Sequence, residues 1–204
     1  MPKASIAVFD IGNVLIRWDP RYLYRKLFTD EAAMERFLAE VCSPAWNLEQ
    51  DRGRSFADAV AQLVEAHPDE ADLIRAFDER WEEMIPGPIE GSVAILERLR
   101  RAGTRTFAIT NFSNEKYAIT EERFDFLGGF EDVVVSAREG VIKPDAAIYR
   151  LLLDRHGLDP AECVFIDDMA YNAEGARAVG MNALHFTDPE AMAAGLAALG
   201  IKGA

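Results

Sequence analysis

The alternation of strand-like and helix-like segments after Gly87 is the feature that most constrains the fold of this 204-residue chain. Short apolar runs rich in β-branched residues are followed by longer segments with helical periodicity, the pattern of βαβ units and a parallel sheet. The predicted strands are residues 105–110, 132–136, 163–167 and 182–186. The predicted helices are residues 92–101, 114–124, 145–156, 172–179 and 188–199. The sequence therefore predicts an α/β fold.

One more strand is predicted at residues 5–10, and a long insertion separates it from the rest of the sheet. The next predicted strand begins only at Arg105, although a crossover helix needs far fewer residues. Pro86-Gly87-Pro88 ends the insertion as a stiff linker that no helix crosses. Within it, three groups of apolar residues recur at helical spacing: Ala33, Met34, Phe37, Leu38 and Val41; Ala59, Val60, Leu63 and Val64; Leu73, Ile74, Phe77 and Trp81.

We therefore expect two domains: an α/β core of residues 1–16 and 86–204, and a helical cap domain of residues 17–85. The cap would be hinged onto the core where the chain passes between the two domains, near residues 17 and 85. No internal repeat or low-complexity tract interrupts this organisation.

Polar side chains follow four of the predicted strands. Asp10 ends the first strand, Thr110-Asn111 the second and Asp167-Asp168 a later one, while Lys143-Pro144 follows residues 132–136. Because ligands in open α/β sheets bind outside the carboxyl ends of the strands, we expect these groups to form one site. Each alone is also typical of a turn or a helix cap. Two adjacent carboxylates after a buried strand, however, repel each other unless a cation is near.

The composition narrows the range of partners. A formal net charge of −13 and a pI near 4.7 argue against nucleic acid or an anionic membrane surface, because both would repel the protein. Cys42 and Cys163 have no Cys or His cluster around them, which argues against a zinc site and indicates two reduced thiols. No run reaches membrane-spanning length and no signal peptide is recognisable. We therefore expect a cytoplasmic protein with no membrane partner, and its oligomeric state stays open.

Three stretches carry a resemblance to a known family: FDIGNVL (9–15), QDRGRSF (50–56) and KPDAAIY (143–149). Together with Thr110 and Asp167-Asp168, their order resembles the haloacid dehalogenase-like (HAD) hydrolase superfamily, subfamily IA with a helical C1 cap. The chain looks most like the branch of sugar-phosphate phosphatases and the phosphatase domain of epoxide hydrolase. The resemblance implies a Rossmann-like core and a Mg²⁺-dependent phosphomonoester hydrolase. Such an enzyme acts on a small phosphorylated metabolite through an aspartyl-phosphate intermediate.

The resemblance also implies a role for each motif residue, and the roles suit phosphoryl transfer, which needs an in-line nucleophile and dense positive charge. Asp10 would attack phosphorus. Lys143 would place its charge on the phosphate, and Thr110 and Asn111 would donate hydrogen bonds to it. The expected Mg²⁺ ligands are the carboxylate of Asp10, the backbone carbonyl of Gly12 and a carboxylate of Asp167 or Asp168.

The polar segment Trp46–Gly53 is predicted between two helices of the cap. It is either a solvated loop or a segment that faces the core. In the second case Glu49, Asp51 and Arg52 would bind the substrate and select it.

One position departs from the family pattern. Most phosphatases of this superfamily carry a second Asp two residues after the nucleophile as general acid and base, and Gly12 stands there instead. A backbone carbonyl can still bind metal, but the proton donor to the leaving group is missing. We therefore expect substrates with good leaving groups to react faster than simple alkyl phosphates, by more than in relatives that keep the second Asp.

Two other functions fit parts of the pattern. A metal-free 2-haloacid dehalogenase would use Asp10 to attack carbon and needs no acid for the leaving halide. Against it, Asp167 and Asp168 would place extra negative charge beside an anionic haloacid, which favours the phosphatase. The second alternative is a module that binds a phosphometabolite or a partner with little turnover.

Overall fold

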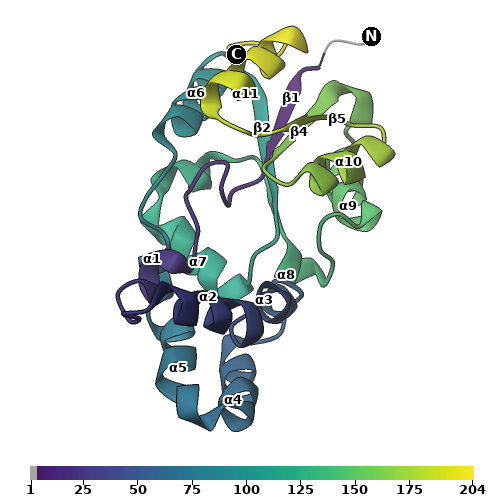
Figure 1. Cartoon of the computed structure of the whole chain (residues 1–204). Coiled ribbons are helices and arrows are strands. Elements are labelled where there is room, and N and C mark those ends of the chain that lie inside the picture. The colour runs from purple at the N-terminus through teal and green to yellow at the C-terminus, as the bar shows by residue number, and fades with distance from the viewer. Residues whose placement is uncertain (1–3) are drawn as a thin grey trace.

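The computed structural model describes residues 4–204 and contains a five-stranded parallel sheet with the strand order β3-β2-β1-β4-β5 (Figure 1). The strands are β1 (Ile6–Phe9), β2 (Arg105–Thr110), β3 (Val133–Val135), β4 (Cys163–Asp167) and β5 (Asn182–His185). In the paired register Ile6 lies opposite Arg105 of β2 and Cys163 of β4. The strand order reverses beside β1, because β2 and β3 lie on one side of it and β4 and β5 on the other. The α/β fold predicted from the sequence is confirmed.

Helices cover both faces of the sheet, because successive residues of a strand point to opposite faces. Ala7 and Phe9 of β1 belong to the apolar cluster that contains Leu96 of α6 and Leu196 of α11. Val8 belongs to the opposite cluster. The helices outside residues 17–85 are α6 (Glu90–Arg101), α7 (Asn114–Arg123), α8 (Ser136–Glu139), α9 (Ala146–His156), α10 (Ala170–Ala178) and α11 (Pro189–Ala198), with 3-10 helices at Asp125–Gly129 and Pro160–Glu162.

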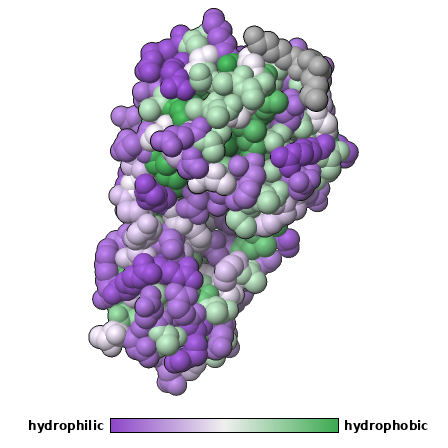
Figure 2. Space-filling view, turned by 45° about the horizontal axis from the view of Figure 1, so that its top comes forward, coloured by the Kyte–Doolittle hydropathy of each residue, from purple (hydrophilic) through white to green (hydrophobic). Residues whose placement is uncertain are grey.

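The inserted segment, residues 17–85, is helical and lies beyond the carboxyl edge of the sheet (Figure 1). Figure 2 shows the molecule narrowing between this segment and the larger part that holds the sheet. The buried ring of Tyr24 lies at its centre, with ring centroids 5.1 Å from Phe37 and 6.3 Å from Phe77. Its helices are α1 (Arg21–Tyr24), α2 (Glu31–Glu40), α3 (Pro44–Asp51), α4 (Phe56–Ala66) and α5 (Ala71–Glu79), with 3-10 helices at Pro68–Glu70 and Trp81–Met84.

The three helices predicted from apolar spacing in this segment are confirmed as α2, α4 and α5, but α3 was not expected. Residues Trp46–Asp51 are helical rather than a loop, and only Arg52 and Gly53 form the turn. The Ser43 hydroxyl accepts a hydrogen bond from the Trp46 amide, and Pro44 occupies the first turn. A capping serine followed by proline is a strong start signal for a helix.

Within residues 4–204, none of the helices combines the length and the apolar character needed to cross a membrane. The division into a core domain and a cap domain at residues 17 and 85 stays a prediction.

Candidate active site

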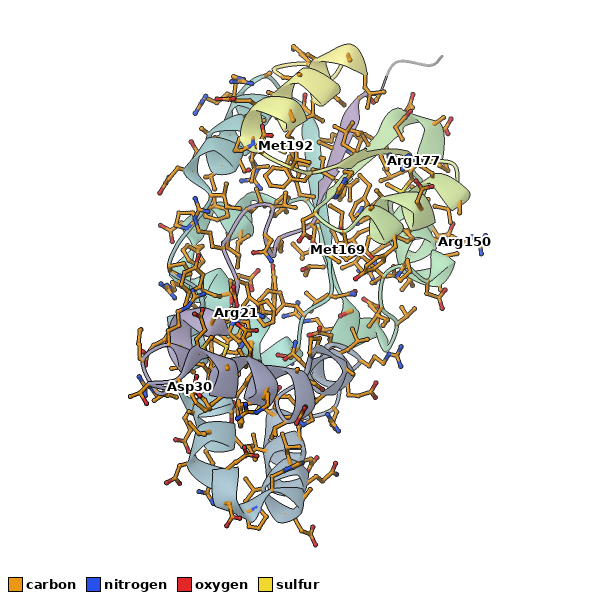
Figure 3. All side chains as sticks on the ribbon, in the orientation of Figure 1. Arg21, Asp30, Arg150, Met169, Arg177 and Met192 are labelled. Carbon is orange, nitrogen blue, oxygen red and sulfur yellow. The ribbon has the colours of Figure 1, made fainter. Side chains whose placement is uncertain are left out.

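The four groups expected at the strand ends come together at the carboxyl edge of the sheet. Asp10 follows β1, Thr110 ends β2, Asp167 ends β4, and Lys143 reaches the same place from the loop between α8 and α9. The site lies beside β1, where the strand order reverses and where open α/β sheets bind their ligands. Met169, two residues after Asp167, marks this edge, which faces the inserted segment (Figure 3).

Lys143 is the buried cation at the centre of the site. Its Nζ lies 2.8 Å from Asp10 Oδ1 and 2.7 Å from Asp167 Oδ2. The ammonium also lies 5.4 Å from the centroid of the Phe165 ring. Burial lowers the pKa of Lys143, but attraction to Asp10 and Asp167 outweighs burial, and the pKa is raised above its ordinary value. Lys143 is therefore charged throughout the neutral range.

Asp10 keeps one carboxylate oxygen free. The Ile11 amide and the Lys143 ammonium both donate to Oδ1, at 2.7 and 2.8 Å, and no described residue donates to Oδ2. Burial and the negative charges of Asp167 and Asp168 raise the pKa of Asp10, the ammonium of Lys143 opposes them, and the resulting pKa is about 7. The carboxylate is held in one orientation by its bonded oxygen, and the other oxygen is available to a ligand or an electrophile.

Asp10, Asp167 and Asp168 offer carboxylate oxygens that all lie within 4.8 Å of one another. Burial and the neighbouring Asp167 raise the pKa of Asp168. Three carboxylates face only one ammonium here, and oxygen donors of this kind suit Mg²⁺. The residues present therefore fit a hard divalent cation.

The two carboxylates after β4 differ in their remaining acceptor capacity. Asp167 accepts from Lys143 Nζ at Oδ2, and from the Met169 amide at 2.8 Å and the Asn172 side chain at 3.0 Å at Oδ1. A carboxylate offers about four acceptor positions, so Asp167 is nearly saturated. Asp168 is half-buried and makes no side-chain hydrogen bond or ion pair with another described residue. It therefore keeps more capacity for an ion.

Thr110 and Asn111 offer different groups. The Thr110 hydroxyl is buried and has no hydrogen-bond partner among the described residues, and Thr110 lines a cavity. The Asn111 carboxamide instead holds the backbone of Lys143: its Nδ2 donates to the Lys143 carbonyl at 3.1 Å, and its Oδ1 accepts from the Lys143 amide at 2.8 Å. Asn111 therefore positions the lysine and has one amide hydrogen left for a substrate.

A cavity of about 100 Å³ opens beside these groups, between the sheet edge and the inserted segment. Asp10, Gly12, Thr110 and Asn111 form its floor. The remaining lining residues are mainly aromatic or polar: Trp18, Asn47, Asp51, Phe56, Trp81, Phe112, Ser113 and Lys116. The structure thus places a partly apolar cavity against Asp10.

Of the three residues proposed to select substrate, the structure brings only Asp51 to the cavity. Glu49 and Arg52 are exposed and pair with each other at 3.4 Å. The helical conformation explains the separation, because consecutive residues on a helix point in directions about 100° apart. The substrate-binding role expected of Glu49 and Arg52 therefore has no support in this geometry.

Sequence reasoning missed several lining residues. Lys116, on α7, is buried and bonds to the Asp78 carboxylate and, at 2.9 Å, to the Asp78 carbonyl. Trp18 and Trp81 lie in the inserted segment and look like ordinary core aromatics in the sequence. None of these residues belongs to a motif, so only the placement of the inserted segment against the sheet identifies them.

Comparison with known proteins agrees with this geometry. The chain is 26% identical over 182 residues to a sesquiterpene phosphatase from Aspergillus oryzae, an alignment that covers 89% of each chain. It is 29% identical over 202 residues to a flavin mononucleotide hydrolase from Arabidopsis thaliana, covering 98% of this chain and 79% of the relative.

Solved structures share the fold at lower identity. A HAD family enzyme from Bacteroides thetaiotaomicron, in complex with magnesium and inorganic phosphate, superposes with a TM-score of 0.69 at 20% identity, covering 91% of this chain and 95% of that one. An L-2-haloacid dehalogenase from Xanthobacter autotrophicus superposes with a TM-score of 0.63 at 17% identity, covering 97% of this chain and 84% of that one. The fold alone thus occurs in a phosphate-binding enzyme and in a dehalogenase. The family model for haloacid dehalogenase-like hydrolases matches residues 5–180, and this chain belongs to that family of hydrolases.

Proposed function

We propose that this protein is a Mg²⁺-dependent phosphomonoester hydrolase that works through an aspartyl-phosphate on Asp10. The observation that carries the proposal is the cluster of three carboxylates around the buried Lys143, next to the unpaired hydroxyl of Thr110. The three carboxylates can bind a divalent cation, and that cation together with Lys143 can then neutralise the negative charge of a bound phosphate. Two relatives named as a phosphatase and a mononucleotide hydrolase add support.

The chain's own residues account for the transfer. Oδ2 of Asp10, the oxygen without a donor, attacks phosphorus while Oδ1 stays bonded to Lys143 and the Ile11 amide. The Thr110 hydroxyl and the remaining amide hydrogen of Asn111 donate to phosphate oxygens. When bound, Mg²⁺ supplies positive charge to the phosphate and offsets the negative carboxylates. Water then hydrolyses the acyl phosphate and restores Asp10.

We assign the direct metal contact after β4 to Asp168, with Asp10 and the Gly12 carbonyl as the other protein ligands. Asp167 would act mainly by holding Lys143 and the loop, because its oxygens already accept three hydrogen bonds. Asp168 is assigned to the metal and Asp167 to Lys143 because Asp168 has more oxygen acceptor positions free.

The substrate we propose is a small phosphorylated metabolite whose leaving group is at least partly apolar. In this assignment residues 17–85 act as a cap domain, and Trp18, Phe56 and Trp81 of that segment contact the leaving group together with Phe112. Apolar and aromatic walls with a few polar groups are typical of sites for organic ligands. The names of the relatives, a sesquiterpene phosphatase and a flavin mononucleotide hydrolase, are consistent with this class.

Activity with p-nitrophenyl phosphate tests the proposal against the dehalogenase alternative. We expect release of nitrophenol that requires Mg²⁺, is abolished reversibly by EDTA and is absent in Asp10→Asn. A 2-chloropropionate assay for released chloride should be negative. Undiminished phosphatase activity in EDTA would refute the metal assignment. Chloride release without nitrophenol release would establish the dehalogenase instead.

A further inference from the structure

The cavity over Asp10 contains a second carboxyl group, that of Asp51. Among the described residues that line the cavity, Asp10 and Asp51 are the two with acidic side chains. They come from opposite sides, Asp10 from the sheet edge and Asp51 from the end of α3 in the inserted segment. We propose that Asp51 is the general acid and base of the reaction, a role for which the loop after β1 has no side chain at Gly12. This inference rests on the phosphatase function proposed above.

The chain fixes Asp51 against the core although it belongs to the inserted segment. The buried hydroxyl of Ser136, at the start of α8, donates to the Asp51 carbonyl at 2.6 Å. Gly53 has φ of 110° and approaches α8 so closely that a Cβ there would lie 3.1 Å from the Ala137 carbonyl. The turn therefore needs glycine for both its conformation and its contact. These contacts fix the backbone of Asp51, which lines the cavity, against the core.

The surroundings of Asp51 favour proton exchange near neutral pH. Burial raises the pKa of Asp51, the Lys143 charge and the Ser113 backbone amide oppose it, and the resulting pKa is about 7. A catalytic acid works best when its pKa lies near the operating pH, because both protonation states are then populated. Lys143 is the charged group that acts on the Asp51 carboxyl directly. The elements packed nearby also carry Asp10, Lys116 paired with Asp78, Arg138 bonded to Asn114, Arg52 bonded to Glu49 and Arg54 bonded to Gln50.

Among the described residues that line the cavity, no other group is suited to exchange this proton. The ammonium of Lys116 is held by the carboxylate and the carbonyl of Asp78. Asn47, Thr110, Asn111 and Ser113 carry amides or hydroxyls that do not titrate near neutral pH. Asp10 is the nucleophile and forms the new bond itself. Asp51 is therefore the group left to protonate the leaving oxygen.

The chemistry balances over two half-reactions. In the first, Asp10 Oδ2 forms the O–P bond as the P–O bond to the leaving group breaks, and the Asp51 carboxyl gives its proton to the leaving oxygen. In the second, the Asp51 carboxylate takes a proton from water as that water attacks the acyl phosphate. The P–O bond to Asp10 breaks, inorganic phosphate departs, and Asp51 is protonated again.

The first test compares leaving groups. Phenyl phosphate and p-nitrophenyl phosphate are hydrolysed with Mg²⁺ by the native protein, by Asp51→Asn and by Glu65→Gln, an exposed acidic residue of α4 that does not line the cavity. We expect Asp51→Asn to lower kcat/KM for phenyl phosphate by about 10²–10⁴-fold and to change it only a few-fold for p-nitrophenyl phosphate. Glu65→Gln should behave as the native protein.

The same variant should also show a burst. Because nitrophenol leaves without help but water attack needs the base, Asp51→Asn should release one equivalent of nitrophenol rapidly and then turn over slowly. Equal losses on both substrates without a burst, or no loss at all, would overturn the assignment. Failure of the native protein to hydrolyse either ester would instead refute the phosphatase function itself.

A second test needs no variant and therefore does not depend on the folding of Asp51→Asn. In single turnovers of the native protein with Mg²⁺, the ratio of the phenyl phosphate rate to the p-nitrophenyl phosphate rate should fall as pH rises through about 7, because the acid form of Asp51 is lost. The rate with p-nitrophenyl phosphate should not fall in that range. Ionisation of Asp10 acts in the opposite direction but on both substrates alike, so it cancels in this ratio. A ratio of the two rates that stays level across neutral pH would contradict the role of Asp51.

Discussion

Lys143 connects the charged residues of the site. Its ammonium bridges Asp10 and Asp167, and its backbone is fixed by Asn111 from the end of β2. One buried cation thus links the ends of three strands. A buried ion pair is strongly destabilised when one partner is removed, because the other charge stays buried without compensation. Substitutions of its two partners should therefore affect stability as well as chemistry.

Asp167→Asn and Asp168→Asn should fail in different ways. Asp168→Asn removes the proposed metal ligand, and we expect the Mg²⁺ concentration for half-maximal activity to rise by more than about 100-fold. Asp167→Asn removes a positioning carboxylate, with an expected rise of about 10–100-fold. It should also lower the free energy of unfolding by about 3–5 kcal/mol, since Lys143 loses a partner.

Magnesium titrations of activity and urea unfolding in EDTA measure these two effects. Asp168→Asn serves as the stability control, because Asp168 is half-buried and has no side-chain partner among the described residues. A larger effect on magnesium dependence from Asp167→Asn than from Asp168→Asn would reverse the assignment of the direct ligand.

At the scale of elements, α10 approaches the Lys143-Pro144 loop unusually closely. A Cβ at Gly175 would lie 2.8 Å from the Pro144 carbonyl oxygen and 3.0 Å from Tyr149 Oη. Glycine inside a helix costs about 0.5–1 kcal/mol relative to alanine, so its presence in α10 is explained by this contact. The helix that follows the acidic pair therefore packs directly on the loop that carries Lys143.

Gly175→Ala should displace that loop. We expect the clash to lower the free energy of unfolding by about 1–3 kcal/mol, and kcat to fall because Lys143 moves with Pro144. Gly128→Ala is the matched control, since no atom lies within 4 Å of a Cβ built there. Thermal unfolding and kcat on p-nitrophenyl phosphate are the measurements. An alanine at 175 that stabilises the protein and leaves kcat unchanged would show that the contact relaxes without consequence.

Helices and strands marked by an apolar pattern or a terminal glycine could be predicted from the sequence. Elements without such a pattern, whose position depends on contacts with residues far along the chain, could not. β2 and β4 have the predicted bounds, because each is a short apolar run, and the helices before them end at glycine, Gly103 and Gly157, with positive φ. α3 was missed because it has no apolar stripe and only its Ser43-Pro44 start indicates a helix. Without an apolar stripe, the sequence also could not show which side of α3 Asp51 lies on.

The candidate site divides in the same way. Convergence of Asp10, Thr110, Lys143 and Asp167 follows from strand ends meeting at one edge of a parallel sheet, so it could be predicted. The bonding of Asn111 to Lys143 and the burial of Lys116 could not, because both depend on contacts between elements far apart in the chain.

At the scale of the whole molecule, side chains of α7 connect the part of the chain that holds the sheet to the inserted segment. Lys116 reaches across to Asp78 of α5, and its ammonium lies 4.7 Å from the ring centroid of Phe56 in α4. Glu115 accepts from the Phe56 amide at 3.3 Å. These contacts fix how the aromatic residues of the inserted segment stand over the floor of the site.

Lys116→Met should weaken this connection. We expect the free energy of unfolding to fall by about 1.5–3 kcal/mol, the usual range for a hydrogen bond to a charged group, and KM for p-nitrophenyl phosphate to rise. Lys26→Met provides the control, because Lys26 forms an exposed pair with Glu83 that should contribute less than about 1 kcal/mol. Urea unfolding and steady-state kinetics separate the two variants. Equal, small effects would mean that Lys116 does not hold the inserted segment in place.

The phosphoryl group on Asp10 is the central claim, and it can be observed directly. Native protein is mixed with Mg²⁺ and p-nitrophenyl phosphate, quenched rapidly in acid, digested and analysed by mass spectrometry, with Asp51→Asn used to slow hydrolysis of the intermediate. We predict one phosphoryl group, on the peptide that contains Asp10, and none in Asp10→Asn. A turning-over enzyme whose quenched peptides carry no phosphoryl group in Asp51→Asn, or carry it on a residue other than Asp10, would contradict the account.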